Sequence, residues 1–178
     1  MKNVAKFEKV SFNEFERSVL DIDFWKSYHK IYNLESLKEL YDKIIIPARS
    51  TKRSAGYDFY FPLWDIALSP GTSVKIPTGI KVDIHEEDWF LGLFTKSGLS
   101  QEYHTRLIDT ISVIDADYYG TKNEGHIFAE ITNGSNKVLN LKNGMKYIQG
   151  IFIEYGLVDG DNVTTEREGG YGSTSDPI

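Results

Sequence analysis

Residues 69–94 read SPGTSVKIPTGIKVDIHEEDWFLGLF, and this stretch decides the fold. It holds three short runs of strand-forming residues, SVKI, GIKVDI and WFLGLF, and turn signals stand at Ser69-Pro-Gly and Pro77-Thr-Gly. Many short strands at nearly regular spacing favour a β-sandwich or jelly roll over a parallel α/β sheet. The same pattern, with further turn signals at Asn133-Gly-Ser and Asn143-Gly, continues in KIII (43–46), YDFYF (57–61), TISVI (110–114), HIFAEI (126–131), KVLNL (137–141) and YIQGIFIEY (147–155).

The segments on either side of this β domain, residues 43–159, have different patterns. In residues 1–42 apolar residues recur at helical spacing, and both Ser11 with Glu14 and Ser36 with Glu39 match the Ser-x-x-Glu capping pattern. The second Ser-x-x-Glu could also lie inside its helix. We therefore expect a short helical N-terminal extension made of two helices. Residues 160–178 are polar and glycine-rich, which is typical of a mobile tail.

Composition excludes several function classes. The chain has 178 residues and a net charge of −6, which disfavours non-specific binding to nucleic acids. It has no cysteine, so disulfides, thiolate zinc sites and cysteine nucleophiles are excluded. No apolar run reaches the roughly 18–20 residues of a membrane span, and the first residues lack an apolar signal core. We expect a cytoplasmic protein with no membrane partner.

Three local features carry residues suited to chemistry. The segment 54–58, SAGYD, is a turn that feeds a strand with a carboxylate at its mouth. In 113–120, VIDADYYG, Asp115 and Asp117 alternate and would share one face of a strand. The segment 167–174, REGGYGST, combines an arginine, hydroxyls and glycines, which suits phosphate binding. Each feature alone is more often structural, as a turn, as solvated acids or as a chain end.

Taken together and in this order, the features resemble the five motifs of the trimeric dUTPase family. The resemblance covers about residues 44–175. The counterparts of the five motifs are Pro47-Ala-Arg-Ser-Thr51 through Ala55-Gly-Tyr-Asp58, then Thr95-Lys-Ser-Gly-Leu-Ser100, then Ser112-Val-Ile-Asp-Ala-Asp-Tyr-Tyr-Gly120, then Gly144-Met-Lys-Tyr-Ile-Gln149, and finally Arg167 to Ser175.

The resemblance implies an all-β fold, the dUTPase-like jelly roll or β-clip, assembled as a homotrimer. It implies hydrolysis of dUTP to dUMP and pyrophosphate, with Mg²⁺ as cofactor and attack of water on the α-phosphorus. Each active site in that family is built from three chains, so residues 160–178 would form a glycine-rich arm that closes over a neighbouring active site.

The resemblance also assigns roles to single residues. Asp115 matches the base that activates water, and Asp58 matches the carboxylate that holds the Mg²⁺ shell through water. Tyr118 matches the aromatic ring that lies against the deoxyribose and excludes a 2′-hydroxyl. The other substrate-binding positions are Lys96, Ser97, Gly98 and Gln149 around the phosphates, Ile114 at the uracil, and Arg167, Tyr171, Gly172, Ser173 and Thr174 in the arm.

Four positions depart from the family pattern. Tyr119 replaces the usual arginine or glutamine, and Arg167 lies one residue closer to the Gly-Gly pair than in the commonest form of the arm. Lys96 stands where arginine is usual, so a bidentate phosphate contact becomes a point charge. Asp109 stands where a base-contacting asparagine is usual, and an ionised aspartate only accepts hydrogen bonds. The amino group of cytosine is a donor. Asp109 therefore suggests a dCTP/dUTP pyrophosphatase of relaxed base specificity, unless its side chain points away from the base.

Two rival functions remain. The related deaminase branch that acts on dCTP lacks the glycine arm present here at 167–175. A regulatory binding protein on the dUTPase scaffold would use the N-terminal extension as a surface for a regulatory protein partner. The presence of Asp115, Asp58, Ser97 and Gln149 favours an enzyme, because a pseudoenzyme would be expected to lose at least one of them.

Overall fold

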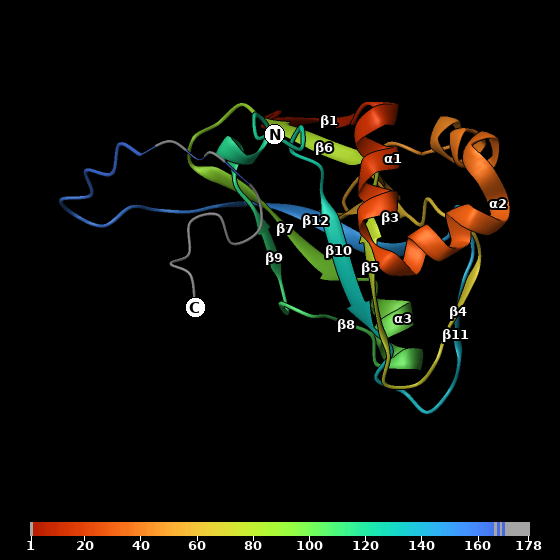
Figure 1. Ribbon diagram of the computed structural model, residues 1–178. Helices are drawn as coiled ribbons and strands as arrows, with labels where there is room; N and C mark the ends of the chain where they lie inside the picture. The colour runs from red at the N-terminus through yellow and green to blue at the C-terminus, as the bar shows by residue number, and fades with distance from the viewer. Residues whose placement is uncertain (1, 166, 168, 170–178) are drawn as a thin grey trace, which may run out of the picture.

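Antiparallel strands make up the frame of this protein, whose computed structural model describes residues 2–165, 167 and 169 (Figure 1). The largest sheet has the strand order β2-β3-β12-β7-β9, and smaller sheets have the orders β5-β10-β8, β1-β6 and β11-β4. The predicted all-β jelly-roll class is confirmed. The strands are β1 Ala5–Lys9, β2 Ala48–Arg49, β3 Tyr57–Tyr60, β4 Ile66–Leu68, β5 Ser73–Pro77, β6 Ile80–Ile84, β7 Trp89–Thr95, β8 Arg106–Leu107, β9 Ser112–Ile114, β10 Phe128–Thr132, β11 Leu139–Leu141 and β12 Lys146–Glu154.

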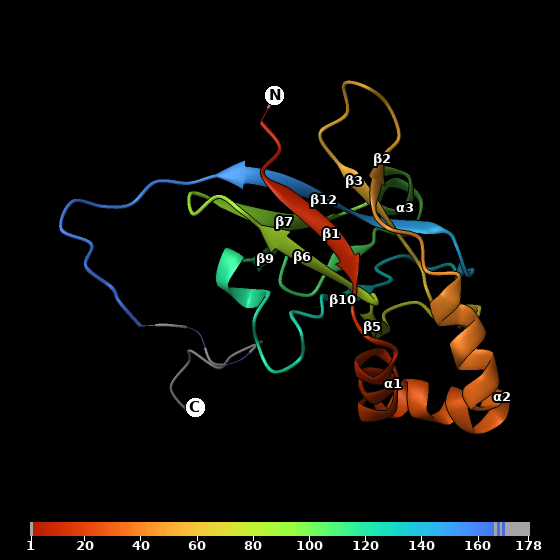
Figure 2. The same cartoon turned by 90° about the horizontal axis from the view of Figure 1, so that it is seen from above.

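Several strand boundaries differ from the sequence prediction. The run at 43–46 is not a strand, because the Lys43 amide still bonds to helix carbonyls, and the chain leaves the helix there. The run at 110–114 forms a strand only from Ser112, since Thr110 has a φ of 67°. Strands β1, β2, β4 and β8 were not predicted. Of these, β1 lies beside β6 with five residue pairs in antiparallel register (Figure 2).

β12 is the strand that ties the largest sheet together. It pairs with β3 on one side and β7 on the other, both antiparallel. At Gly150 an added Cβ would lie 2.8 Å from Leu91 Cδ1 and 3.0 Å from Phe59 Cε2, so only glycine leaves room for the neighbouring side chains. The close packing fixes the register in which β3 and β7 present their polar ends.

The N-terminal extension holds the two predicted helices, α1 Phe12–Asp21 and α2 Asp23–Asp42. The Ser11 hydroxyl accepts the Glu14 amide at 3.1 Å, which confirms the predicted N-cap. α2 is kinked at Asn33, whose φ is 64° and whose side chain accepts the Ser36 amide. Ser36 therefore lies inside the second half of α2. Two more helical segments are α3 Ser97–Tyr103 and the 3₁₀ helix η1 Ala116–Tyr118.

α1 and α2 pack on one side of the β domain (Figure 1). Phe15 and Val19 of α1 and Trp25 and Leu37 of α2 are all fully buried in the common core. The indole Nε1 of Trp25 donates to the carbonyl of Lys75 on β5 at 2.6 Å. The extension is therefore part of the domain's core and not a loosely attached segment.

The segment after β12 leaves the body of the molecule. Residues 155–165 form a loop that extends outward on the side opposite α2 in both views and turns back near residue 160, where the Asp161 amide donates to the Val158 carbonyl (Figures 1 and 2). Leu157, Val158 and Val163 on this segment are each at least 75% exposed. In the part of the chain that the structure describes, no helix combines the length and the apolar character that crossing a bilayer requires.

We predict that Leu37→Ala lowers the free energy of unfolding by about 2–5 kcal/mol, because it opens a cavity between α2 and the β domain. Urea unfolding followed by tryptophan fluorescence measures the change. The matched control is Leu34→Ala on the same helix, where the side chain is 47% exposed. Equal and small effects of both substitutions would contradict the packing of α2 into the core.

Candidate functional site

A buried carboxylate joins three of the sequence motifs. Asp58 on β3 has a side chain that is 1% exposed. It accepts hydrogen bonds from the ammonium of Lys96 at the end of β7, from the ammonium of Lys146 at the start of β12 at 2.9 Å, and from the Ser50 hydroxyl at 2.5 Å. The β12 register places Gln149 opposite both Asp58 and Phe94, which explains why these chain segments meet.

The charges around Asp58 control its protonation. Burial raises the pKa of this carboxyl, but hydrogen bonds from Lys96, Ser50 and Lys146 outweigh burial and lower the pKa to about 2. One carboxylate between two ammonium groups leaves a net charge of +1, which attracts an anion. The cluster is therefore a suitable place for a phosphate.

The residues beside this cluster form an open turn. Lys96 precedes α3, and Ser97 and Gly98 are its first residues. A Cβ added at Gly98 would meet no atom within 4 Å, so this backbone is accessible to a ligand. Gln149 donates from Nε2 to the Thr95 carbonyl at 3.4 Å. The structure thus brings the predicted site residues Asp58, Lys96, Ser97, Gly98 and Gln149 together.

A second group of predicted residues lies at the end of β9. The strand stops at Ile114, and Asp115 is the N-cap residue of the 3₁₀ helix η1, so the expectation that Asp115 and Asp117 share a strand face is wrong. Both acids nevertheless meet one arginine. Nη2 of Arg167 lies 3.0 Å from Asp115 Oδ2, and its Nε lies 3.5 Å from Asp117 Oδ1.

Tyr118 stands between Arg167 and the interior. Its side chain is buried, and burial raises the pKa of the Tyr118 hydroxyl. That hydroxyl donates to the His126 carbonyl at 2.7 Å and accepts from Asn123 Nδ2 at 2.7 Å. The Arg167 guanidinium lies 5.9 Å from the ring centroid. Sequence reasoning missed Asn123 and His126, since neither belongs to a motif or has metal-ligand spacing.

The two groups are not adjacent within one chain. Three strand steps separate β3 from β9, and strands lie about 4.8 Å apart, which gives about 14 Å. Gln149 of β12 lies opposite Asp58 on one side and opposite Phe94 of β7 on the other. Ile114 of β9 pairs with Leu91, which is three residues from Phe94 on β7, and this offset adds about 10 Å along the strands. A single chain therefore presents the predicted residues as two separate groups, the half-sites of the expected shared site.

The remaining predicted residues lie elsewhere. Asp109 is exposed in the turn between β8 and β9, where its carbonyl accepts the Ile111 amide at 2.7 Å. The predicted arm residues Tyr171, Gly172, Ser173 and Thr174 lie outside the described residues.

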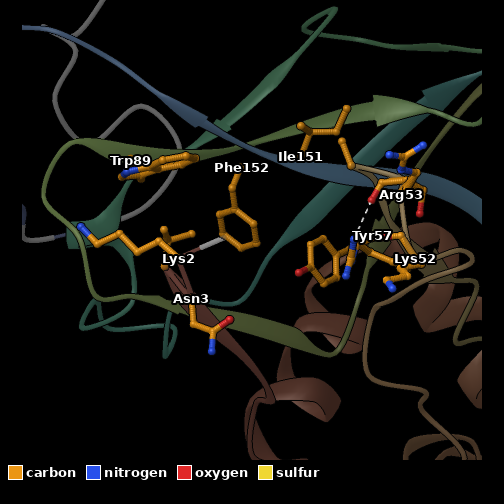
Figure 3. A pocket seen from close by; sticks show the side chains of 12 residues that line it. Lys2, Asn3, Lys52, Arg53, Tyr57, Trp89, Ile151 and Phe152 are labelled. Carbon is orange, nitrogen blue, oxygen red and sulfur yellow. Dashed lines mark hydrogen bonds between the residues drawn. The ribbon is translucent and has the colours of Figure 1, made fainter.

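A cavity of about 930 Å³ is lined in part by residues of the first motif (Figure 3). Its lining includes none of the residues predicted for catalysis or phosphate binding. Trp89 and Phe152 lie on one side of it and Tyr57 on the other, and Lys52 and Arg53 lie beside Tyr57. It therefore belongs to the surface of the sheet and not to either half-site.

Comparisons with known proteins agree with the motif pattern. A family model described as dUTPase matches residues 42–175. The deoxyuridine 5′-triphosphate nucleotidohydrolase of Lactococcus lactis subsp. lactis is 36% identical over 134 residues, which cover 74% of this chain and 88% of that protein. The enzyme of the same name from Desulfitobacterium hafniense is 30% identical and covers 72% of this chain and 86% of its own length.

Solved structures give the same result. The crystal structure of a dUTPase from Streptococcus mutans superposes with a TM-score of 0.60 and 30% identity, and covers 86% of this chain and 98% of that one. The dUTPase from phage phi11 of S. aureus superposes with a TM-score of 0.59 over 92% of this chain and 97% of its own. At 17% identity the phage enzyme supports the fold alone.

We predict that Asp58→Asn destabilises the protein at neutral pH by about 1–2 kcal/mol, because two ammonium groups lose their counter-charge. The folded pKa of about 2 lies below the ordinary 3.8, so the stabilisation is present above about pH 4 and is lost as the pH falls towards 2. Urea unfolding at stepped pH values should therefore show a shallower acid slope for the variant. Asp42→Asn, at an exposed pair with Lys38, is the control. An unchanged acid slope for Asp58→Asn would contradict this assignment.

Proposed function

The chain belongs to the dUTPase family, and we propose that it hydrolyses dUTP to dUMP and pyrophosphate at sites shared between copies of the chain. The observation that carries this proposal is the grouping of motif residues from distant parts of the sequence. Asp58, Lys96 and Gln149 meet around one carboxylate, and Asp115 meets Tyr118 and Arg167 at the end of β9.

Asp115 is the proposed base. Its side chain is 43% exposed, so water can reach it, and its present partner is Arg167. When dUTP is bound, Arg167 turns to the phosphates, and Asp115 is left free to orient a water and take its proton. The water oxygen bonds to the α-phosphorus in line, the bond from that phosphorus to the bridging oxygen breaks, and pyrophosphate leaves. Ile114 and Tyr118 hold the uracil and the deoxyribose.

The Asp58 cluster is the proposed phosphate site. Lys96 is 29% exposed and Lys146 is 40% exposed, so each ammonium can turn towards a triphosphate while Asp58 fixes its position. Backbone amides at Ser97 and Gly98 and the side chain of Gln149 complete the contacts. Lys96 contributes a positive charge but cannot make the bidentate phosphate contact of an arginine.

Mg²⁺ fits this site only through water. The described residues contain no group of three acidic or histidine side chains that could hold a metal directly. A carboxylate offers about four lone-pair positions, and Lys96, Lys146 and Ser50 take three of those on Asp58. One position remains for a water of the Mg²⁺ shell. The bound ion would neutralise charge on the triphosphate and on the leaving pyrophosphate.

A shared site in a homotrimer is the arrangement that best joins the two groups. The separation of about 14 Å across the sheet and about 10 Å along it supports contributions from different chains. Residues 155–158 run outward from the body, and in the trimer the arm, residues 160–178, would give up the contact of Arg167 with Asp115 of its own chain and reach a neighbour. In that position Tyr171 would stack on the base, and Gly172, Ser173 and Thr174 would lie at the phosphates.

We predict that Asp115→Asn lowers kcat for dUTP about 10²–10⁴-fold, because the amide cannot accept the proton of water. Pyrophosphate release with Mg²⁺ measures the rate, and unfolding curves confirm that the variant is folded. A variant that retains wild-type turnover would overturn the assignment of Asp115.

Mixing variants tests the shared site. Lys96→Ala and Asp115→Asn chains should each be weakly active alone. Co-refolding them in equal amounts should restore about a quarter of the wild-type rate. In random trimers, a site that takes Lys96 from one chain and Asp115 from another has both residues intact in about one case in four. If the mixture is no more active than its components, both groups act within one chain.

A second candidate function is relaxed base choice, with dCTP as an additional substrate. The exposed carboxylate of Asp109 in the β8–β9 turn supports it, because an acceptor suits the cytosine amino group better than the uracil O4. We predict that Asp109→Asn lowers the ratio of dCTP to dUTP turnover. Wild-type protein that ignores dCTP, together with no effect of Asp109→Asn, would remove this candidate.

A regulatory binding role for residues 1–42 has one supporting observation. α2 leaves apolar side chains exposed on its outer face, namely Phe24, Ile31, Tyr32 and Leu34. The two groups of motif residues favour the enzyme, and a regulatory role of the extension is compatible with it.

A further inference from the structure

The N-terminal strand and first helix contact the loop that carries Tyr118. That loop, residues 115–126, follows β9 and includes η1. Side chains from β1 and α1 hold it at three points. The family model begins at residue 42, so these contacts come from residues outside the range that the model matches.

The first contact joins β1 to the end of η1. The hydroxyl of Tyr119 donates to Glu8 Oε2 at 2.7 Å. The Lys81 ammonium lies 5.0 Å from the Tyr119 ring centroid, and Lys81 is the residue that pairs with Glu8 in the β1–β6 ladder. The β1–β6 pair therefore presents both an anion and a cation to Tyr119.

The second contact joins the start of α1 to the tip of the loop. The Glu124 carboxylate accepts the Ser11 amide at 2.9 Å and the Ser11 hydroxyl at 2.6 Å. Glu124 has a φ of 58°, a conformation unusual for a residue with a side chain, and the contact to Ser11 helps to hold it. A carboxylate at this position also complements the positive end of the α1 dipole.

The third contact is buried. His126 Nε2 accepts the Gly79 amide at 2.9 Å, so the proton of the neutral ring is on Nδ1. Nδ1 lies 3.0 Å from the Ser18 hydroxyl and 3.4 Å from Glu14 Oε1, and Ser18 donates to that same carboxylate at 2.9 Å. The end of the loop is thus fixed to two residues of α1.

Within the loop, these anchors act directly on Tyr118. Its hydroxyl donates to the carbonyl of His126, the third anchored residue. Gly125 packs so closely that an added Cβ would lie 2.7 Å from the Cα of Tyr119. A loop packed this tightly shifts as a unit, so a displaced anchor displaces the Tyr118 ring and the neighbouring Asp115.

We propose that Glu8, Ser11 and Glu14 are positioning residues for the nucleotide site, and that the N-terminal segment 5–21 sets how closely Tyr118 fits the sugar. The proposal rests on the proposed function for the role of Tyr118. It gives the extension a part in choosing deoxyribose over ribose, in addition to its part in the core.

The test compares Tyr119→Phe, Glu124→Gln and the double variant with a matched control. Tyr155→Phe is that control, because the Tyr155 hydroxyl also donates at 2.7 Å, to the Glu87 carbonyl, away from the loop. The ratio of kcat/KM for dUTP to that for UTP should fall about threefold in each single variant and about tenfold in the double variant. Tyr155→Phe should leave the ratio unchanged.

Hydrogen exchange of the amides of residues 115–126, measured without nucleotide, gives an independent result. Exchange should be faster in the double variant and unchanged in Tyr155→Phe. A purely structural role would lower both substrates' rates by one factor and leave their ratio at the wild-type value, which would overturn the proposal. Unchanged exchange would overturn it as well. If the wild type hydrolyses no dUTP, the proposed function fails, while exchange still tests the anchoring of the loop.

Discussion

The pairing of Asp58 with Lys96 and Lys146 is the interaction on which the arrangement of the proposed phosphate half-site depends. It joins β3, the β7–α3 junction and the start of β12, and a buried carboxylate without these partners would be costly. Because β12 pairs with both β3 and β7, the sheet brings the three charges into contact before any ligand binds. The same pairs hold each ammonium in place, so a polyphosphate bound at the proposed site would meet preorganised cations.

Much of the fold and of this half-site could be predicted from sequence. Turn glycines and alternating runs located most strands, and the motifs located Asp58, Lys96 and Gln149. The missed strand β1 is a short and highly charged run, AKFEK, which forms a strand only because β6 offers an edge. The strand expected through Asp115 ends at Ile114, since the following residues bond locally in a 3₁₀ helix.

The contacts of the N-terminal extension could not be predicted, for a physical reason. The Ser11–Glu14 pattern predicted a helix cap, and the Ser11 hydroxyl does accept the Glu14 amide. The Glu14 carboxylate, however, contacts Ser18 and His126. The Ser11 amide is satisfied by Glu124, more than a hundred residues later. The local sequence pattern indicates which backbone amides at a helix start need a hydrogen-bond acceptor, whereas tertiary packing determines which distant carboxylate is that acceptor.

The division of the motif residues into two half-sites has a consequence for how activity depends on assembly. A chain that folds alone holds Asp115 about 14 Å across the sheet from the charges around Asp58, so the proposed shared site makes folding and activity separable. If neighbouring chains complete each site, the active fraction follows the association equilibrium, and the folded monomer is inactive. The loop with Asp115 and Tyr118 is nonetheless anchored within its own chain, by β1 and α1. In the proposed shared site the extension would therefore fix one half-site before assembly, which would limit the ordering that binding of a neighbour and of nucleotide otherwise requires.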